Sequence, residues 1–321
     1  MGARIGKIEY FLPEKVVTND DLAREFSDFS PDKVKDKIGI CQRHVAAEGE
    51  TALDLAVGAA AKLLADGANN DVDFVLLCTQ SPDYFLPTSA CILQDRLGLG
   101  TKVGAFDINL GCSGYVYALA VAKGLLASHA AAKVLLVTAE TYSKHISPDD
   151  KSDRIIFGDA ASATIVEPSA AEDIREFVFG TDGRGCDKLI VRNGGMRNRH
   201  AANTADDYLF MDGPEIFNFT IESLPGAFND LLTKNQLGMD DLDQVIFHQA
   251  NKYMLDYLRR KIKIPTEKFY IDMEDVGNTV SSTIPIAIKR SRDKGVVKDG
   301  DVVVLLGFGV GYSWGGTVVR L

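Results

Sequence analysis

The chain repeats itself, and this duplication constrains the fold more than any single motif does. Residues 71–80 read DVDFVLLCTQ, and residues 241–250 read DLDQVIFHQA. Residues 106–113 (FDINLGCS) are matched by residues 272–279 (DMEDVGNT), in the same order and at nearly the same spacing. Short apolar runs typical of buried strands alternate with helical patterns along the chain. The sequence therefore predicts a duplicated α/β fold made of two pseudo-symmetric halves.

The boundary between the halves is expected within residues 168–180. We expect an N-terminal half at residues 1–170 and a C-terminal half at residues 171–321, which share one core. In the first half, residues 31–50 are polar and charged and are expected to form a loop region. The other expected elements are helices from Asp21 and over 51–65 and 87–97, and strands at 74–78, 103–108 and 133–138.

Cys112 lies at the junction between an expected buried strand and an expected helix. The apolar run 103–108 precedes it, and the helical pattern after Ser113 is apolar nearly all round. Free N–H groups and the positive end of the dipole at a helix start favour a thiolate. The stretch predicts a nucleophile at Cys112, and a buried structural cysteine is the alternative interpretation.

The duplication gives His248 and Asn278 a meaning that neither has alone. Asn278 is the equivalent of Cys112, and His248 ends a buried strand at the position equivalent to Cys78. In α/β folds, strand ends and helix starts are where ligands bind, so we expect these segments to meet at one pocket. A satisfied core histidine and a helix cap are the alternatives for His248 and Asn278, respectively.

A glycine-rich loop, residues 307–311, follows the apolar strand near the end of the chain. A dinucleotide-binding loop is excluded, because no helix and no ribose-binding acid can follow it. We expect a tight strand–turn–strand instead. Its backbone N–H groups at Gly309 and Val310, together with the N–H of Cys112, are predicted to form an oxyanion hole.

The composition excludes several classes of function. The 321 residues carry 46% hydrophobic side chains, as in globular proteins, and a net charge of −10 that disfavours nucleic-acid and anionic-membrane partners. No apolar run is long enough to span a bilayer. Five cysteines without a Cys-x-x-Cys pair fit free thiols in a reducing cytoplasm. Cys41 and His44 have a metal-like spacing, but no second ligand pair accompanies them, so no metal site is expected.

Four ordered motifs resemble the β-ketoacyl-ACP synthase III family of the thiolase superfamily. They are NLGCSGY around Cys112, HQAN at 248–251, GNT at 277–279 and GFGVGYSWG at 307–315. The match is collinear over essentially the whole chain. The resemblance implies a thiolase-like five-layer αβαβα fold, a homodimer, and a catalytic triad of Cys112, His248 and Asn278.

The resemblance also implies a decarboxylative Claisen condensation without a cofactor. Cys112 takes an acyl group from an acyl-CoA or acyl-ACP, and the loop N–H groups hold the tetrahedral oxyanion. His248 and Asn278 then donate hydrogen bonds to malonyl-ACP and stabilise the enolate that is left when CO₂ departs. One alternative is an acyltransferase of similar type that passes the acyl group to a non-malonyl nucleophile in specialised metabolism. Another is a catalytically silent partner subunit, which the intact triad disfavours.

Further site residues are implied by the same resemblance. The implied substrate contacts are Leu86, Tyr142, Phe157, Gly213, Phe217, Lys37, Lys151 and Asn251. The tryptophan and arginines with which the family clamps CoA are absent here, and lysines such as Lys37 and Lys151 stand in their region, so the donor can be CoA or an acyl carrier protein. The helix from 252 to 263 carries basic residues that either dock an acidic carrier protein or form a solvated face. These residues are Lys252, Arg259, Arg260 and Lys261.

Overall fold

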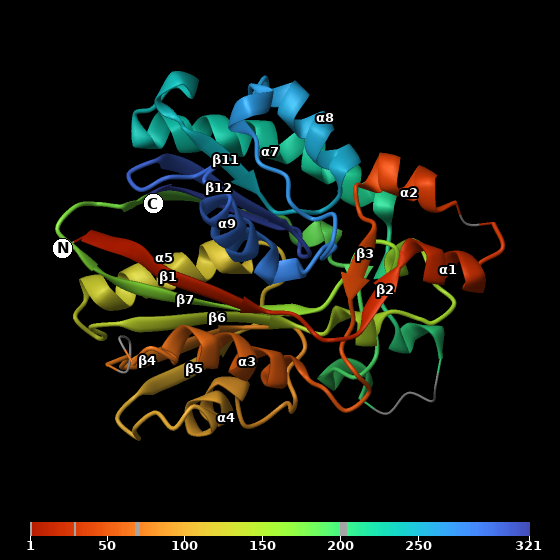
Figure 1. Ribbon diagram of the computed structural model, residues 1–321, viewed down its shortest axis with the longest axis horizontal. Coiled ribbons are helices and arrows are strands. Elements are labelled where there is room, and N and C mark those ends of the chain that lie inside the picture. The colour runs from red at the N-terminus through yellow and green to blue at the C-terminus, as the bar shows by residue number, and fades with distance from the viewer. Residues whose placement is uncertain (1, 29, 68–70, 200–203) are drawn as a thin grey trace.

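The computed structural model describes residues 2–28, 30–67, 71–199 and 204–321, and two mixed β-sheets form the centre of this part (Figure 1). The first sheet has the order β1-β7-β6-β4-β5, and the second has the order β11-β12-β13-β8. The first consists of β1 (Gly2–Phe11), β4 (Phe74–Cys78), β5 (Gly104–Ile108), β6 (Val134–Glu140) and β7 (Ala160–Ser169). The second consists of β8 (Ile174–Thr181), β11 (Gln244–Phe247), β12 (Val302–Gly309) and β13 (Ser313–Arg320). Two short ribbons pair β2 (Val16–Thr18) with β3 (Gln42–His44), and β9 (Leu189–Ile190) with β10 (Phe210–Met211).

The two sheets share one pairing pattern, which confirms the predicted pseudo-symmetry. In the first sheet, β4 is parallel to β5 and β6, whereas β7 is antiparallel to β6 and β1. In the second, β12 is parallel to β11 and antiparallel to β13, which is antiparallel to β8. The second sheet has no full strand at the place that corresponds to β5 among the described residues. A single parallel bridge between Val245 and Phe269 takes that place.

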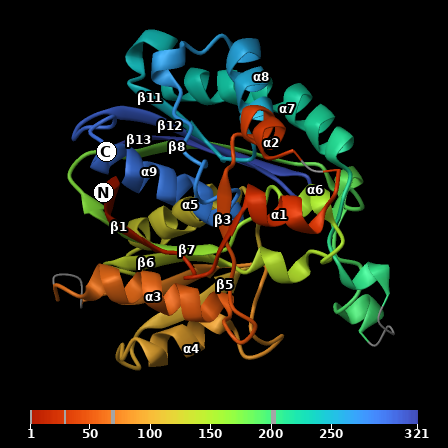
Figure 2. The same ribbon diagram turned by 45° about the vertical axis from the view of Figure 1, so that its right-hand side comes forward.

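Helices lie in three layers around the two sheets (Figures 1 and 2). The outer face of the first sheet is covered by α3 (Ala52–Leu64) and α4 (Ser89–Arg96). The outer face of the second sheet is covered by α7 (Gly213–Asn235) and α8 (Lys252–Ile262). Between the sheets lie α5 (Gly114–Ala127) and α9 (Thr283–Asp293). This order of helix, sheet, helix, sheet and helix is the predicted five-layer fold.

The central layer explains why the segment after Cys112 is apolar nearly all round. Because α5 contacts strands of both sheets, it has few positions left for polar side chains. Leu119 of α5, Leu76 of the first sheet and Leu305 of the second belong to one apolar core. The strands of the first sheet end at Ser169 and those of the second begin at Ile174. Because this core joins the sheets, the division of the chain at residues 170 and 171 stays a prediction.

The expectation of a loop over residues 31–50 is wrong, because this stretch contains a helix and a strand. The helix α2 (Pro31–Ile38) begins with proline in its first turn and ends at Gly39, whose φ of 78° suits glycine. These end signals, with packing of α2 on α8, outweigh its polar composition. The remaining α-helices described are α1 (Asn19–Glu25) and α6 (Lys151–Arg154). The 3₁₀ turns described are Tyr142–His145, Gly183–Gly185, Met196–Asn198, Ala205–Asp207, Met239–Asp241, Thr266–Lys268 and Val280–Ser282.

Candidate active site

A cavity of about 110 Å³ lies where the two halves meet, and the three predicted catalytic side chains line it together. Cys112 comes from the turn between β5 and α5, His248 follows β11, and Asn278 precedes the turn into α9. All three are buried. Most of the remaining wall is apolar, with Phe157 and Phe308 among the residues that form it. The structure thus brings together three residues that lie far apart in the sequence.

Glycines around Cys112 make its position sterically possible. A Cβ at Gly309 would lie 3.1 Å from the Cys112 Sγ, and a Cβ at Gly307 would lie 2.8 Å from the Cys112 carbonyl oxygen. The neighbouring Ser113 hydroxyl contacts the Ser313 hydroxyl at 2.7 Å and ties this turn to the second half. Any side chain at Gly309 would therefore displace or cover the thiol. Gly309 and Val310 remain predicted oxyanion donors.

The resting thiol of Cys112 is neutral, contrary to the thiolate expected from its place before a helix. Burial raises the pKa of Cys112 to about 12, and the nearby carboxylate of Glu140 raises it further. The backbone N–H at Cys112 opposes this shift without overcoming it. Loss of water around a charge outweighs the helix start here, because the surrounding cavity is mainly apolar.

A hydroxyl that the sequence analysis missed sets the orientation of His248. The Thr283 hydroxyl donates to the Val280 carbonyl at 3.0 Å and lies 2.7 Å from the His248 Nδ1. Because a hydroxyl has only one proton, we assign the imidazole proton to Nδ1, which donates to Thr283. Burial lowers the pKa of His248 to about 3, so the ring is neutral. Its Nε2 then faces the Asn278 amide nitrogen, 3.5 Å away, as an acceptor.

The Asn278 side chain is oriented by its own turn. Its Oδ1 accepts from the Val280 N–H at 2.9 Å, which leaves the amide N–H groups free to point toward His248. Its backbone bridges Phe157 of the first half. Asn278 does not begin a helix directly, as the repeat suggested, because a 3₁₀ turn at Val280–Ser282 precedes α9. This turn brings the Thr283 hydroxyl next to the His248 Nδ1.

Glu140 is a fully buried carboxyl group near the cysteine, and no motif pointed to it. It ends β6 and accepts hydrogen bonds from the Gln80 N–H at 3.0 Å and the Ser81 hydroxyl at 2.9 Å. The Ser281 hydroxyl, three residues after Asn278, donates to it at 3.4 Å. Burial raises the pKa of Glu140 to about 8. The carboxyl group thus connects the loop after β4 with the turn that holds Asn278.

Three of the implied substrate contacts line the catalytic cavity, namely Phe157, Gly213 and Asn251. Phe217 does not line it. Its neighbour Ile216 does, because adjacent residues of α7 point about 100° apart. The Phe217 ring instead lies against two tyrosines of α8.

The other implied contacts lie outside the cavity wall. Tyr142 is buried behind it, with its ring 5.2 Å from that of Phe157 and its hydroxyl donating to Gln80 at 3.0 Å. Leu86 is 80% exposed, and Lys37 is exposed on α2. Lys151 forms an ion pair of 2.5 Å with Asp28. None of these four residues lines the cavity, and their roles as substrate contacts stay predictions.

The four basic residues of the predicted docking helix differ in their availability. Lys252 and Lys261 are exposed at opposite ends of α8. Arg260 is exposed, although its Nε donates to the Asp256 carbonyl. Arg259 is half-buried and donates to the Ile264 carbonyl at 3.2 Å, so it caps the helix end rather than facing solvent. Lys252, Arg260 and Lys261 are thus the exposed members of the four predicted docking residues, and their role stays a prediction.

Among the described residues, no group of three His, Cys, Asp or Glu side chains is arranged to hold a metal ion. In the same part of the chain, none of the helices has the length and apolar character needed to cross a membrane.

Comparisons with known proteins agree on one family. The family model for 3-oxoacyl-[acyl-carrier-protein (ACP)] synthase III matches residues 106–183, and the model for the C-terminal part of that enzyme matches residues 232–321. The beta-ketoacyl-[acyl-carrier-protein] synthase III of Clostridium perfringens (strain ATCC 13124) is 35% identical over 317 residues, which cover 97% of each chain.

Solved structures of enzymes with this name are also similar to this chain in sequence and in fold. A 3-oxoacyl-(acyl-carrier-protein) synthase III solved at 2.1 Å superimposes with a TM-score of 0.98 at 50% identity, over 100% of both chains. The corresponding enzyme from Pseudomonas aeruginosa PAO1 gives a TM-score of 0.91 at 32% identity, over 100% of this chain and 98% of that one. These likenesses confirm the thiolase-like fold expected from the four motifs.

Proposed function

The chain belongs to the beta-ketoacyl-[acyl-carrier-protein] synthase III family and is an acyltransferase of the condensing type, and we propose that Cys112, His248 and Asn278 carry its reaction. The observation that supports this assignment is their convergence on one apolar cavity from three separate segments. The mainly apolar wall disfavours water in a reaction whose intermediates water would destroy. The nucleophile, the hydrogen-bond donors and the acyl pocket all belong to this chain, so the proposed reaction needs no cofactor.

Acyl loading requires the resting thiol of Cys112 to lose its proton, because the thiolate is the nucleophile. Its sulfur attacks the carbonyl carbon of an acyl-CoA or acyl-ACP, and the thiol proton ends on the departing CoA or carrier thiol. The backbone N–H groups of Cys112, Gly309 and Val310 would hold the oxyanion that forms on the way. No hydrogen bond joins the thiol to His248 among the described residues, and we propose that loading does not require that ring.

Condensation then uses His248 and Asn278. Malonyl-ACP loses CO₂, the enolate oxygen is stabilised by hydrogen bonds, and the enolate carbon attacks the acyl group and releases the Cys112 sulfur. Asn278 can donate directly. For His248 to donate as well, the ring must carry its proton on Nε2, and the Thr283 hydroxyl must then donate to Nδ1 instead of Val280. Thr283 can accommodate both tautomers, because a hydroxyl both donates and accepts.

The proposed condensation is tested by supplying an acyl-CoA or acyl-ACP together with malonyl-ACP. We expect a β-ketoacyl-ACP and one CO₂ for each acyl group consumed. Acyl transfer to another acceptor without malonyl-ACP would instead support the alternative acyltransferase. Neither product nor acyl-enzyme with any donor would indicate a silent partner subunit.

We place carrier-protein docking on Lys252, Arg260 and Lys261 of α8. Lys252 directly follows Asn251, which lines the cavity, so an acidic carrier protein bound along this helix could deliver its thioester there. Reversing charge in the double variant R260E/K261E should raise the KM for malonyl-ACP about tenfold. Acyl loading from CoA should stay unchanged, since it needs no carrier protein. Equal loss with both donors would contradict docking at this helix.

We propose a homodimer that pairs along β5, the edge strand of the first sheet. This strand has one unpaired edge in the described structure, and its Phe106 is partly exposed. The loop that precedes α4 also exposes Phe85 and Leu86. This loop lies next to β5, because the first N–H groups of α4 donate to Asp107 of that strand. In such a dimer Leu86 could serve the partner's substrate pocket. A monomeric mass by light scattering would contradict this proposal.

We also propose that the protein is cytoplasmic. All five cysteines are free thiols, and two of them, Cys91 and Cys186, are exposed. Exposed free thiols persist in a reducing compartment and oxidise outside it.

A further inference from the structure

A second cavity, of about 210 Å³, shares a wall with the catalytic one. Phe157 lines both cavities, but none of the three proposed catalytic residues lines the second. Its walls come from β2, α1, β3 and the segment 143–157. The charged residues among those that line it are Lys15, Arg43 and Arg154, and no carboxylate is among them.

Arg43 is the unusual member of this set, because it is a buried cation without a counter-ion. It is 1% exposed, and its guanidinium donates to the carbonyls of Val17 and Ile155 and to the Asn19 side chain, which are all neutral. Its Nε is buried and has no hydrogen-bond partner, and no carboxylate lies within 4.0 Å of the guanidinium among the described residues. Burial lowers the pKa of Arg43 to about 10. An uncompensated buried charge is costly unless something else pairs with it.

The other two cations add to this positive charge to different extents. Arg154 is neutralised by Glu25 at 2.5 Å and also donates to the Pro148 carbonyl. Lys15 is exposed at the cavity, and no ion pair or hydrogen bond of its side chain is found within the described residues. Arg43 and Lys15 therefore leave the cavity with about two uncompensated positive charges. The apolar side chains of the wall strengthen the attraction for an anion.

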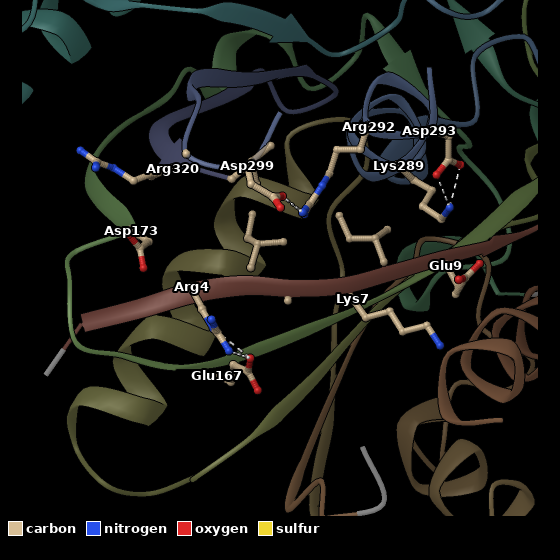
Figure 3. Close-up of a pocket in the computed structure, with 15 residues that line it drawn as sticks. Arg4, Lys7, Glu9, Glu167, Asp173, Lys289, Arg292, Asp293, Asp299 and Arg320 are labelled. Carbon is tan, nitrogen blue, oxygen red and sulfur yellow. Dashed lines mark hydrogen bonds and ion pairs between the residues drawn. The ribbon is translucent and has the colours of Figure 1, made fainter. Parts of the chain in front are cut away.

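A larger cleft of about 730 Å³ between β1 and α9 shows the opposite arrangement (Figure 3). There, Arg4 pairs with Glu167, Lys289 with Asp293 and Arg292 with Asp299, at 2.6 to 2.7 Å. The carboxylates that line this cleft thus largely neutralise its basic residues. The smaller cavity beside Phe157 does not.

We propose that the cavity lined by Lys15, Arg43 and Arg154 is an anion-binding subsite for a phosphate-type oxyanion. Arg43 would pair with the anion from the buried side and Lys15 from the solvent side. The anion is either free phosphate or a phosphate group of a larger ligand such as CoA. Because Phe157 separates this subsite from Cys112, anion binding and acyl loading are compatible. The proposal does not depend on the reaction assigned to the triad.

The test is titration of the full-length protein with inorganic phosphate, followed by calorimetry at ionic strength held constant with chloride. We expect saturable binding of one phosphate per chain. Arg43 also holds β2 and α1, so its replacement could unfold the protein, and Lys15→Glu on the exposed rim is the better variant. It should weaken phosphate binding about tenfold or more. Lys298→Glu makes the same charge change at an exposed lysine that does not line the cavity, and it should leave the affinity unchanged.

Further outcomes decide whether the anion binds at this site and what its source is. Alkylation of Cys112 should leave phosphate binding intact, and its loss would place the anion in the catalytic cavity and overturn the proposal. No binding beyond that of chloride, or equal effects of Lys15→Glu and Lys298→Glu, would also overturn it. Displacement of phosphate by CoA would assign the subsite to a phosphate group of CoA, and simultaneous binding would assign it to free phosphate.

Discussion

Replacing Cys112 with alanine is expected to abolish acyl loading and to lower condensation at least about 10⁴-fold, because no other cysteine is among the described residues that line the cavity. The measurement is intact protein mass after incubation with a panel of acyl-CoAs and acyl-ACPs. Wild-type protein should gain one acyl group, whose mass also identifies the preferred starter. C112A and C112S should gain no thioester-linked group.

The matched control for this experiment is Cys186→Ala. Cys186 is an exposed thiol that does not line the cavity. If acyl groups attached to exposed thiols nonspecifically, C186A would lose mass adducts and C112A would keep them. A C112A variant with full condensing activity would refute the proposed nucleophile.

Replacing His248 or Asn278 with alanine should separate the two half-reactions. We expect each variant to retain acyl loading on Cys112 and to lose condensation by about 10³-fold, the usual cost of removing an oxyanion donor. The structural reason is that both side chains line the cavity next to one another, 3.5 Å apart, whereas neither donates a hydrogen bond to the thiol among the described residues. Acyl-enzyme formation by mass and CO₂ release from malonyl-ACP measure the two steps separately.

The matched control for this separation is Thr283→Ser. Serine keeps the hydroxyl that contacts the His248 Nδ1, so condensation should remain close to that of wild-type protein. Thr283→Val removes the hydroxyl and should reduce CO₂ release while sparing acyl loading. If H248A lost acyl loading as completely as C112A, His248 would have to act in the first step, and the proposed division of roles would be wrong.

Local patterns were sufficient for most elements of the core. The strand at Phe74–Cys78 and the helix over Ala52–Leu64 were predicted nearly to the residue, because apolar periodicity reports burial directly. The helix at Pro31–Ile38 was missed because it has only eight residues, most of them charged or polar, and none of them is buried. Eight residues are about two helical turns, too short a window for an apolar period to predict a helix by itself.

The candidate site divides in the same way. Cys112, His248 and Asn278 could be named because the duplication marks equivalent positions, and a repeat is visible in the sequence alone. Thr283 and Glu140 could not be named. Thr283 acts on His248 across 35 residues of chain. Glu140 ends an entirely buried strand, where a single charged residue reads as the start of a loop.

The sequence by itself determined the duplicated α/β fold, the family and the three residues that meet at the cavity, because periodicity, repeats and motifs are properties of the chain. Only the tertiary structure decided the charge state of those residues. The neutral thiol of Cys112 and the neutral ring of His248 follow from burial, which depends on every segment that packs around them. The uncompensated charge of Arg43 likewise arises only when four distant segments close around it. Desolvation is a property of the assembled interior, and no short stretch of sequence carries it.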